Sequence, residues 1–179
     1  VREYREKILR MFEPLMIRVT NFGIFRESWF KLGEVLQSLC LLNRETFAQF
    51  FLDKIKFGIE EDRISKPVLF GHLAKLAPIT CEHKELCQNI YWIVPQLLGR
   101  LKETSDNHEI DQIFLTLSNH FEFFIGLRAD SGYDHLLQIK DDIEEAAFRL
   151  FKEFLKKALT FKINDKHLAT ILNIGTGVL

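Results

Sequence analysis

The chain has 179 residues, of which 47% are hydrophobic and 27% are charged, and its formal net charge is −1. This balance is typical of one globular domain with a substantial core. Nucleic-acid and anionic-membrane surfaces need clustered Lys and Arg, so a near-neutral chain predicts no nucleic-acid partner. No apolar run reaches the roughly 18 residues of a membrane-spanning helix, so no membrane span is expected.

The cysteines and the first residue carry information about the cellular context. The chain has three cysteines, Cys40, Cys81 and Cys87. Because an odd number cannot all pair within one chain, this set favours reduced thiols over a disulfide framework. The expected location is therefore intracellular, cytoplasmic or nuclear. No signal peptide precedes the first predicted helix and Val1 is not an initiator Met, so a fragment or a processed chain is expected.

In the first half of the chain, apolar residues recur at the spacing of amphipathic helices. The spacing predicts helices over residues 3–20, 25–41, 45–57 and 65–78. Pro14 is expected to kink or restart the first helix. Ser65 is a typical N-cap with Pro67 in the following turn, and that helix is expected to end near Pro78.

The second half of the chain continues this pattern. Its apolar spacing predicts helices over residues 82–102, 107–124, 134–139, 141–159 and 164–172. Pro95 is expected to bend or restart the first of these, and Asp106 or Asn107 to cap the second. The loop 126–132 is expected to be the most mobile, and residues 172–179 to form an unstructured tail. No run alternates with period two, so the predicted fold class is all-α.

The segment 141–159 has a strong amphipathic pattern. Phe148 and Leu159 widen its apolar arc to roughly 220°, which predicts burial against neighbours on two sides. Acidic residues occupy the first turn and lysines the last, as the helix dipole favours. Glu145 and Arg149 are spaced for an i,i+4 ion pair.

Similar apolar segments recur at intervals of about 40 residues, the period of two-helix HEAT and armadillo units. We interpret residues 32–39, 69–76, 114–121 and 150–157 as first helices, and residues 45–57, 86–102 and 166–172 as second helices. The predicted fold is a right-handed α-α superhelix, a HEAT/armadillo-like solenoid of about four helix pairs. It would be a single domain over residues 1–179 and part of a longer array. The alternative is a closed bundle of unrelated helices.

Two of these segments carry fragments of one motif. The first has Arg63 and Leu69-Phe70-Gly71-His72-Leu73-Ala74, and the second has Ala147-Phe148 and Leu150-Phe151. They resemble the Arg-x-x-Ala-Phe-x-Leu-Phe-Gly-x-Leu-Ala helix of the Maestro heat-like repeat family. The resemblance extends more faintly over residues 26–159.

Each copy departs from the family motif. Lys66-Pro67 stands in place of Ala-Phe in the first copy, and Glu144 and Lys152 stand in place of Arg and Gly in the second. The resemblance implies a HEAT-like scaffold or adaptor with no catalytic residues to carry over. Gly71 would allow two helices to approach closely, which would explain a glycine inside a helix.

Several clusters of polar residues are candidates for metal or catalytic sites. Cys81, His83 and Cys87 form the most ligand-like cluster, but zinc needs four ligands and no second pair lies nearby in sequence. Buried thiols and a surface His are therefore expected, with no metal and no cofactor. The polar positions of residues 108–122, including Glu109 and His120, are expected to form a solvated side.

Aromatic residues supply the candidate binding site. Phe51, Trp92 and Phe123 lie partly off the main apolar stripes, which predicts exposure in a groove that binds a protein partner. The leading hypothesis is a non-enzymatic protein-interaction scaffold with a concave surface lined by the second helices. The alternative is a closed α-helical bundle that binds a small apolar ligand or lipid in a Phe-lined pocket.

Overall fold

The computed structural model describes residues 44–60, 66–125, 127 and 132–158, together with isolated residues nearer the ends. Every regular element in this part of the chain is helical, which confirms the all-α class. The helices expected over residues 3–20, 25–41 and 164–172 and the tail 172–179 lie outside the described residues, apart from isolated positions. Most of the loop 126–132 also lies outside them.

The elements agree with most of the expected helices. They are α3 (Arg44–Glu60), α4 (Lys66–Glu82), α5 (Lys84–Cys87), α6 (Ile90–Glu103), α7 (Asn107–Phe121), the 3-10 helix η1 (Glu122–Phe124), α8 (Asp134–Leu137) and α9 (Lys140–Ala158). The single long helix expected over residues 82–102 is instead two helices, because the chain turns at Gln88 and Asn89.

The helix α4 does not end near Pro78 but continues to Glu82. A proline removes one backbone hydrogen bond, the one to the carbonyl four residues before it. Here that carbonyl belongs to Ala74, and it accepts a hydrogen bond from Asn119 of α7 instead. Pro95 likewise lies inside α6 without ending it.

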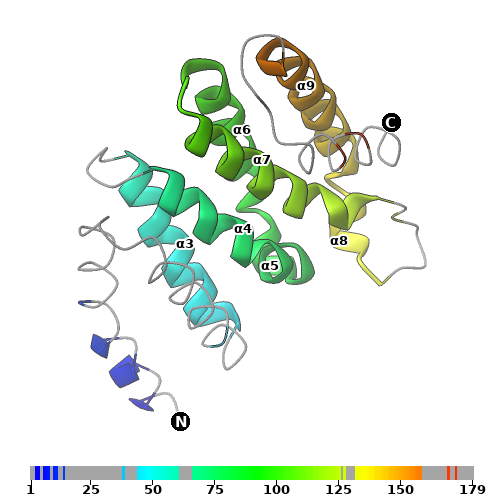
Figure 1. Ribbon diagram of the computed structural model, residues 1–179. Helices are drawn as coiled ribbons and strands as arrows, with labels where there is room; N and C mark the ends of the chain where they lie inside the picture. The colour runs from blue at the N-terminus through cyan, green and yellow to red at the C-terminus, as the bar shows by residue number, and fades with distance from the viewer. Residues whose placement is uncertain are drawn as a thin grey trace.

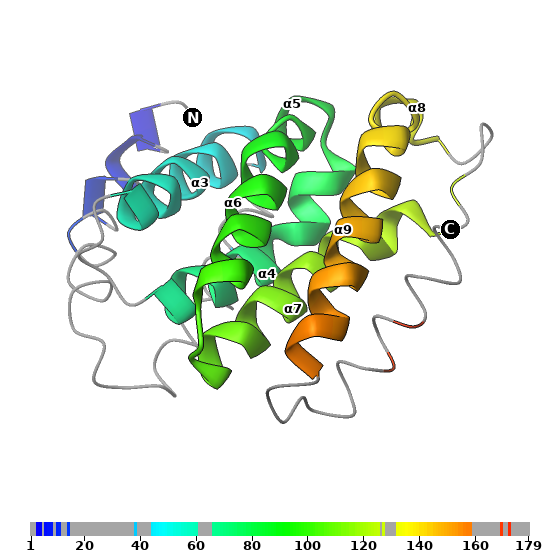
Figure 2. The ribbon, with the colours of Figure 1, turned by 90° about the horizontal axis from the view of Figure 1, so that it is seen from above.

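Helices α4 and α7 form the central pair of the fold and run side by side in the same direction (Figure 1). Helix α3 packs along the other side of α4. Helices α6 and α9 lie next to each other and also run in the same direction (Figure 2). The expected recurrence of residues 69–76, 114–121 and 150–157 requires α9 to be the next helix in the row formed by α4 and α7. Helix α9 instead packs beside α6, so this part of the expectation is wrong.

A different repeat is present. A four-residue helix, a two-residue turn and a long helix occur as α5 and α6, and again 50 residues later as α8 and α9 (Lys84 to Asp134, Ile90 to Lys140). The turn hydrogen bonds match as well: Leu86 N–H donates to His83 O in the first copy, and Leu136 N–H to Tyr133 O in the second. Because the two units are offset by 50 residues, the helices of the second unit do not lie where a 40-residue spacing predicts them.

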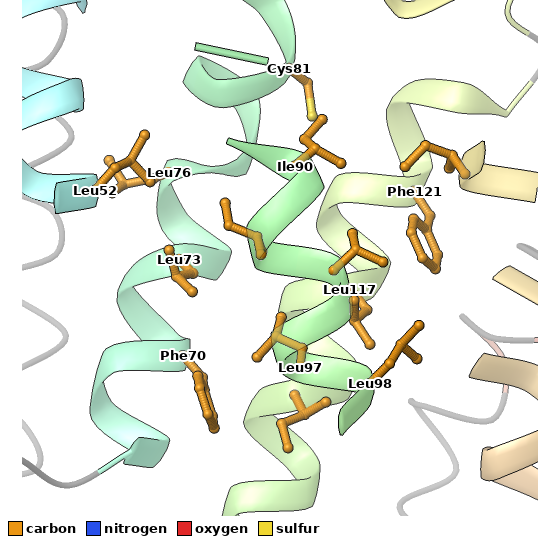
Figure 3. Packing of buried hydrophobic residues seen from close by; sticks show 14 of the residues in the cluster. Leu52, Phe70, Leu73, Leu76, Cys81, Ile90, Leu97, Leu98, Leu117 and Phe121 are labelled. Atoms are coloured by element: carbon orange, nitrogen blue, oxygen red, sulfur yellow. The ribbon is translucent and has the colours of Figure 1, made fainter. Parts of the chain in front are cut away.

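One hydrophobic core joins the described helices from α3 to α9. Its largest fully buried side chains are Phe51, Phe70, Phe114, Phe121 and Phe124. Leu52 of α3 and Leu76 of α4 point toward each other in this core (Figure 3). Phe148 of α9 is 56% exposed, so the widened apolar arc of this helix is not buried on both sides within the described residues.

Candidate functional site

The three aromatic residues expected to be exposed have different environments. Phe51 is fully buried, so the expectation that it lines an open groove is wrong. It lies at the centre of the α3 face that packs on α4, with Leu52 and Ile55 buried beside it. Trp92 and Phe123 are half-buried and pack partly against the core.

Trp92 lines an open hollow of about 320 Å³ between α3 and α6. The other residues of this α3–α6 hollow are Lys56, Ile59, Glu60, Pro95 and Gln96. The Lys56 Nζ atom lies 5.8 Å from the centre of the Trp92 ring, within the range of a cation–π contact. The hollow therefore offers an aromatic surface with a charge of each sign at its edge.

A chain of hydrogen bonds fixes the orientation of Trp92. Its Nε1 donates to Asn89 Oδ1 at 2.9 Å, and Asn89 Nδ2 donates to Gln49 Oε1 of α3 at 3.1 Å. Gln49 Nε2 in turn donates to Asp53 at 2.7 Å. A side chain positioned in this way loses little conformational entropy when it binds a ligand, as a preorganised anchor should.

A second open hollow of about 380 Å³ lies between α6 and α9. Its apolar wall includes Tyr91, Val94, Pro95 and Leu98 of α6, and its charged residues are Lys102, Asp142, Glu145, Arg149 and Glu153. Tyr91 is 52% exposed, and its partial burial together with the neighbouring Asp142 carboxylate raises its pKa. Pro95 lines both hollows, so a single turn of α6 separates them.

We call the two hollows and the Tyr91–Pro95 turn between them the α6 face. Phe123 lies on η1 and lines neither hollow, so the structure does not bring it together with Trp92. Tyr91 and Pro95 were not expected as site residues. The signal that was available is their i,i+4 spacing, which places an aromatic ring and a proline on one exposed stripe.

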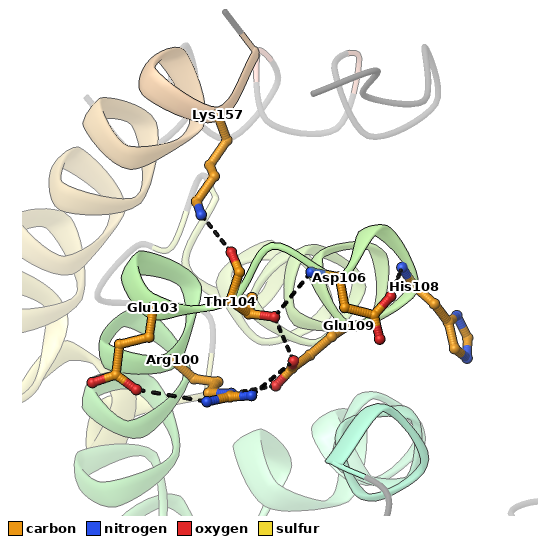
Figure 4. A network of polar contacts seen from close by, with 7 residues as sticks. All are labelled: Arg100, Glu103, Thr104, Asp106, His108, Glu109 and Lys157. Carbon is orange, nitrogen blue, oxygen red and sulfur yellow. Dashed lines mark hydrogen bonds and ion pairs between the residues drawn. The ribbon is translucent and has the colours of Figure 1, made fainter. Parts of the chain in front are cut away.

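A polar network closes the turn between α6 and α7 (Figure 4). Glu109 is buried, and its carboxylate accepts hydrogen bonds from Arg100 Nε at 2.5 Å and Thr104 Oγ1 at 2.5 Å. Lys157 Nζ of α9 donates to Thr104 O at 2.5 Å. Asp106 caps α7 by accepting from His108 N–H at 2.9 Å, as expected.

The expectation that Glu109 and His120 belong to a solvated side is wrong, because both side chains are buried. Because the Glu109 carboxylate accepts hydrogen bonds from Arg100 of α6 and from Thr104 after it, Glu109 joins α7 to α6. His120 Nδ1 donates to Thr116 O at 2.7 Å, and burial lowers the pKa of His120 to about 4. A buried neutral imidazole of this kind packs as part of the core.

The thiols are buried, as expected for Cys81 and Cys87. Cys81 Sγ donates to His120 O at 3.8 Å, and Cys87 Sγ to Lys84 O at 3.2 Å. Burial raises the pKa of both thiols, which keeps them protonated and weakly nucleophilic. Within the described residues, no group of three or more His, Cys, Asp or Glu side chains is arranged to hold a metal ion.

None of the described helices has the length and apolar character needed to span a membrane. Comparison of the chain with protein-family models, with curated proteins and with solved structures finds no match.

Proposed function

We propose that this chain is a non-enzymatic protein-interaction scaffold built from HEAT-like helical repeats, and that a segment of a partner protein binds on its α6 face. The recurrence of the α5–α6 unit as the α8–α9 unit supports the repeat architecture, since stacked repeats share one continuous core. As part of this proposal the chain works in the cytoplasm or nucleus, where Cys81 and Cys87 remain thiols.

The observation that carries the proposal is the Trp92 ring, held in an open hollow by hydrogen bonds that reach α3. Binding energy at protein interfaces concentrates in aromatic and Arg anchors within pockets. Tyr91 in the neighbouring hollow supplies a second aromatic ring with a hydroxyl group. The occupant is a peptide segment with apolar side chains that reach both sides of Pro95.

A peptide library displayed on phage and selected on the purified chain tests the proposal. Selected peptides should bind the Trp92→Ala variant at least tenfold more weakly, about 1.4 kcal/mol, as measured by calorimetry. The matched control is Phe57→Ala, because Phe57 is an exposed aromatic residue of α3 outside both hollows. Selection without enrichment, or peptides that bind both variants equally, would contradict the proposal.

A further inference from the structure

Helix α9 has an exposed apolar flank on the side away from α6. Phe148 is 56% exposed and Leu155 is 49% exposed, and Phe151 between them is half-buried. The residues of α9 that line the α6–α9 hollow, such as Ala146 and Glu153, lie roughly on the opposite flank at 100° per residue. Exposed apolar residues gathered on one helix flank indicate a contact surface.

The 50-residue repeat identifies what kind of surface this is. Val94, Leu98 and Lys102 form a row at i,i+4 spacing on α6, and they line the hollow that faces α9. Fifty residues later the same row on α9 is Glu144, Phe148 and Lys152. The flank of α9 therefore corresponds to the flank of α6 that another helix already covers.

The charges on this row match a reversed copy of the row itself. Glu144 lies four residues before Phe148, and Lys152 lies four residues after it. If two such helices pack antiparallel about a twofold axis through Phe148, the two Phe148 rings meet and each Glu144 lies near Lys152 of the other copy. Interdigitated i±4 rows are the commonest way in which helices pack, with the axes crossing at about −50°.

We propose that a second copy of this chain covers the flank, so that the protein forms a twofold symmetric dimer through α9. Symmetric dimers use the same patch on both subunits, and this row is complementary to itself in apolar character and in charge. Phe151 and Leu155 form the adjacent i,i+4 row and extend the apolar contact on one side of this row. One helix from each copy makes a small interface, so the dimer dissociates on dilution.

Sedimentation equilibrium of the full chain between about 1 and 100 µM tests the proposal. The average mass should rise with concentration from the monomer value toward the dimer value. Phe148→Asp should remain monomeric throughout, with an unchanged circular dichroism spectrum because Phe148 is more than half exposed. Phe57→Asp is the matched control, since Phe57 is similarly exposed on α3, and this variant should dimerise as the parent does.

Charge reversal tests the register. Glu144→Lys and Lys152→Glu should each raise the dissociation constant at least threefold, because each places like charges opposite one another. The double variant restores complementarity and should return the constant to within twofold of the parent. A chain that is monomeric at every concentration, a dimer that survives Phe148→Asp, or a double variant as weak as the single ones would each overturn the proposal.

Discussion

The side-chain amide of Asn119 donates a 3.0 Å hydrogen bond to the carbonyl oxygen of Ala74. In an α-helix this carbonyl would accept from the N–H of residue 78, but that residue is Pro78 and has no N–H. Asn119 thus supplies from α7 the donor that α4 lacks. The bond also ties together the two central helices, beside Thr116 Oγ1, which donates to Phe70 O at 2.7 Å.

Asn119→Ala is expected to lower the free energy of unfolding by about 1–3 kcal/mol, because the buried Ala74 carbonyl loses its replacement donor. In a Pro78→Ala background the same substitution should cost less, since the new N–H can bond to that carbonyl. Urea unfolding of the four proteins measures the coupling between the two sites. Costs that simply add would contradict the proposed link between them.

The buried carboxylate of Glu109 gives a second prediction. Glu109→Ala should lower the free energy of unfolding by about 1.5–3 kcal/mol, because Arg100 and Thr104 both lose a charged acceptor. Glu103 is the control, since it pairs with the same Arg100 at 3.7 Å but is largely exposed. Glu103→Ala should cost less than about 1 kcal/mol. Equal losses in the two variants would show that burial does not matter here.

The elements predicted best from the sequence are helices whose apolar residues lie mainly on one face. Helices α7 and α9 lie close to the predicted 107–124 and 141–159, and Asp106 caps α7 as expected. The predicted helix end near Pro78 is wrong because the donor that compensates for this proline, Asn119, is distant in sequence. A local rule that ends helices near proline cannot include a side chain from another helix.

The candidate site was predictable only in part, for a related reason. The sequence does not show which of the closely spaced phenylalanines of α3, Phe47, Phe50 and Phe51, face the core. Packing against α4 buries Phe51 and leaves Phe50 only half-buried. Trp92 is partly buried against the core, and the hollow around it needs Lys56 from another helix. Glu109 appeared solvated because nothing local shows that Arg100 reaches it.

The two buried histidines make stability depend on pH. Burial lowers the pKa of His72 and of His120 from the ordinary 6.5 to about 4. Between about pH 6.5 and pH 4 the unfolded chain therefore binds more protons than the folded one, so the free energy of unfolding falls as pH falls through this window. Each group contributes a loss on the order of 3 kcal/mol across it.

Urea unfolding at pH 7.5 and at pH 5 measures this loss. His120→Gln keeps a donor for Thr116 O but carries no titrating ring, so the difference between the two pH values should shrink relative to the parent. If the difference in the free energy of unfolding between the two pH values stayed the same in this variant, the pKa of His120 would not be lowered by folding.

The buried thiols should be chemically protected in the folded protein. In a Cys40→Ser variant, Cys81 and Cys87 should react with a disulfide reagent far more slowly than free cysteine, because burial raises the pKa of both thiols. Denaturant should expose both thiols at the same time. The absorbance of the coloured thiol that the reagent releases on reaction measures the rate. A thiol that reacts fast before unfolding would contradict the burial of that side chain, Cys81 in α4 or Cys87 in α5.

Two helical glycines differ in the space around them, which gives a matched pair of substitutions. A Cβ at Gly99 would meet nothing within 4 Å, so Gly99→Ala should raise the free energy of unfolding by about 1 kcal/mol, the helix propensity difference between the two residues. A Cβ at Gly71 would lie 2.9 Å from Gln112 Oε1 of α7, so the amide must move. Because that contact is the end of a flexible side chain, Gly71→Ala should gain less than Gly99→Ala without a large loss.

Gly71→Val separates close helix packing from a simple side-chain contact. A branched side chain would extend beyond the Gln112 amide toward α7, and it should destabilise the protein by about 1–3 kcal/mol, as overpacking does. Thermal or urea unfolding of the three variants measures the order, in which Gly99→Ala is the most stable and Gly71→Val the least. If Gly71→Val were as stable as the parent, the Gln112 side chain would simply move aside, and close packing against α7 would not explain why a glycine is placed inside α4.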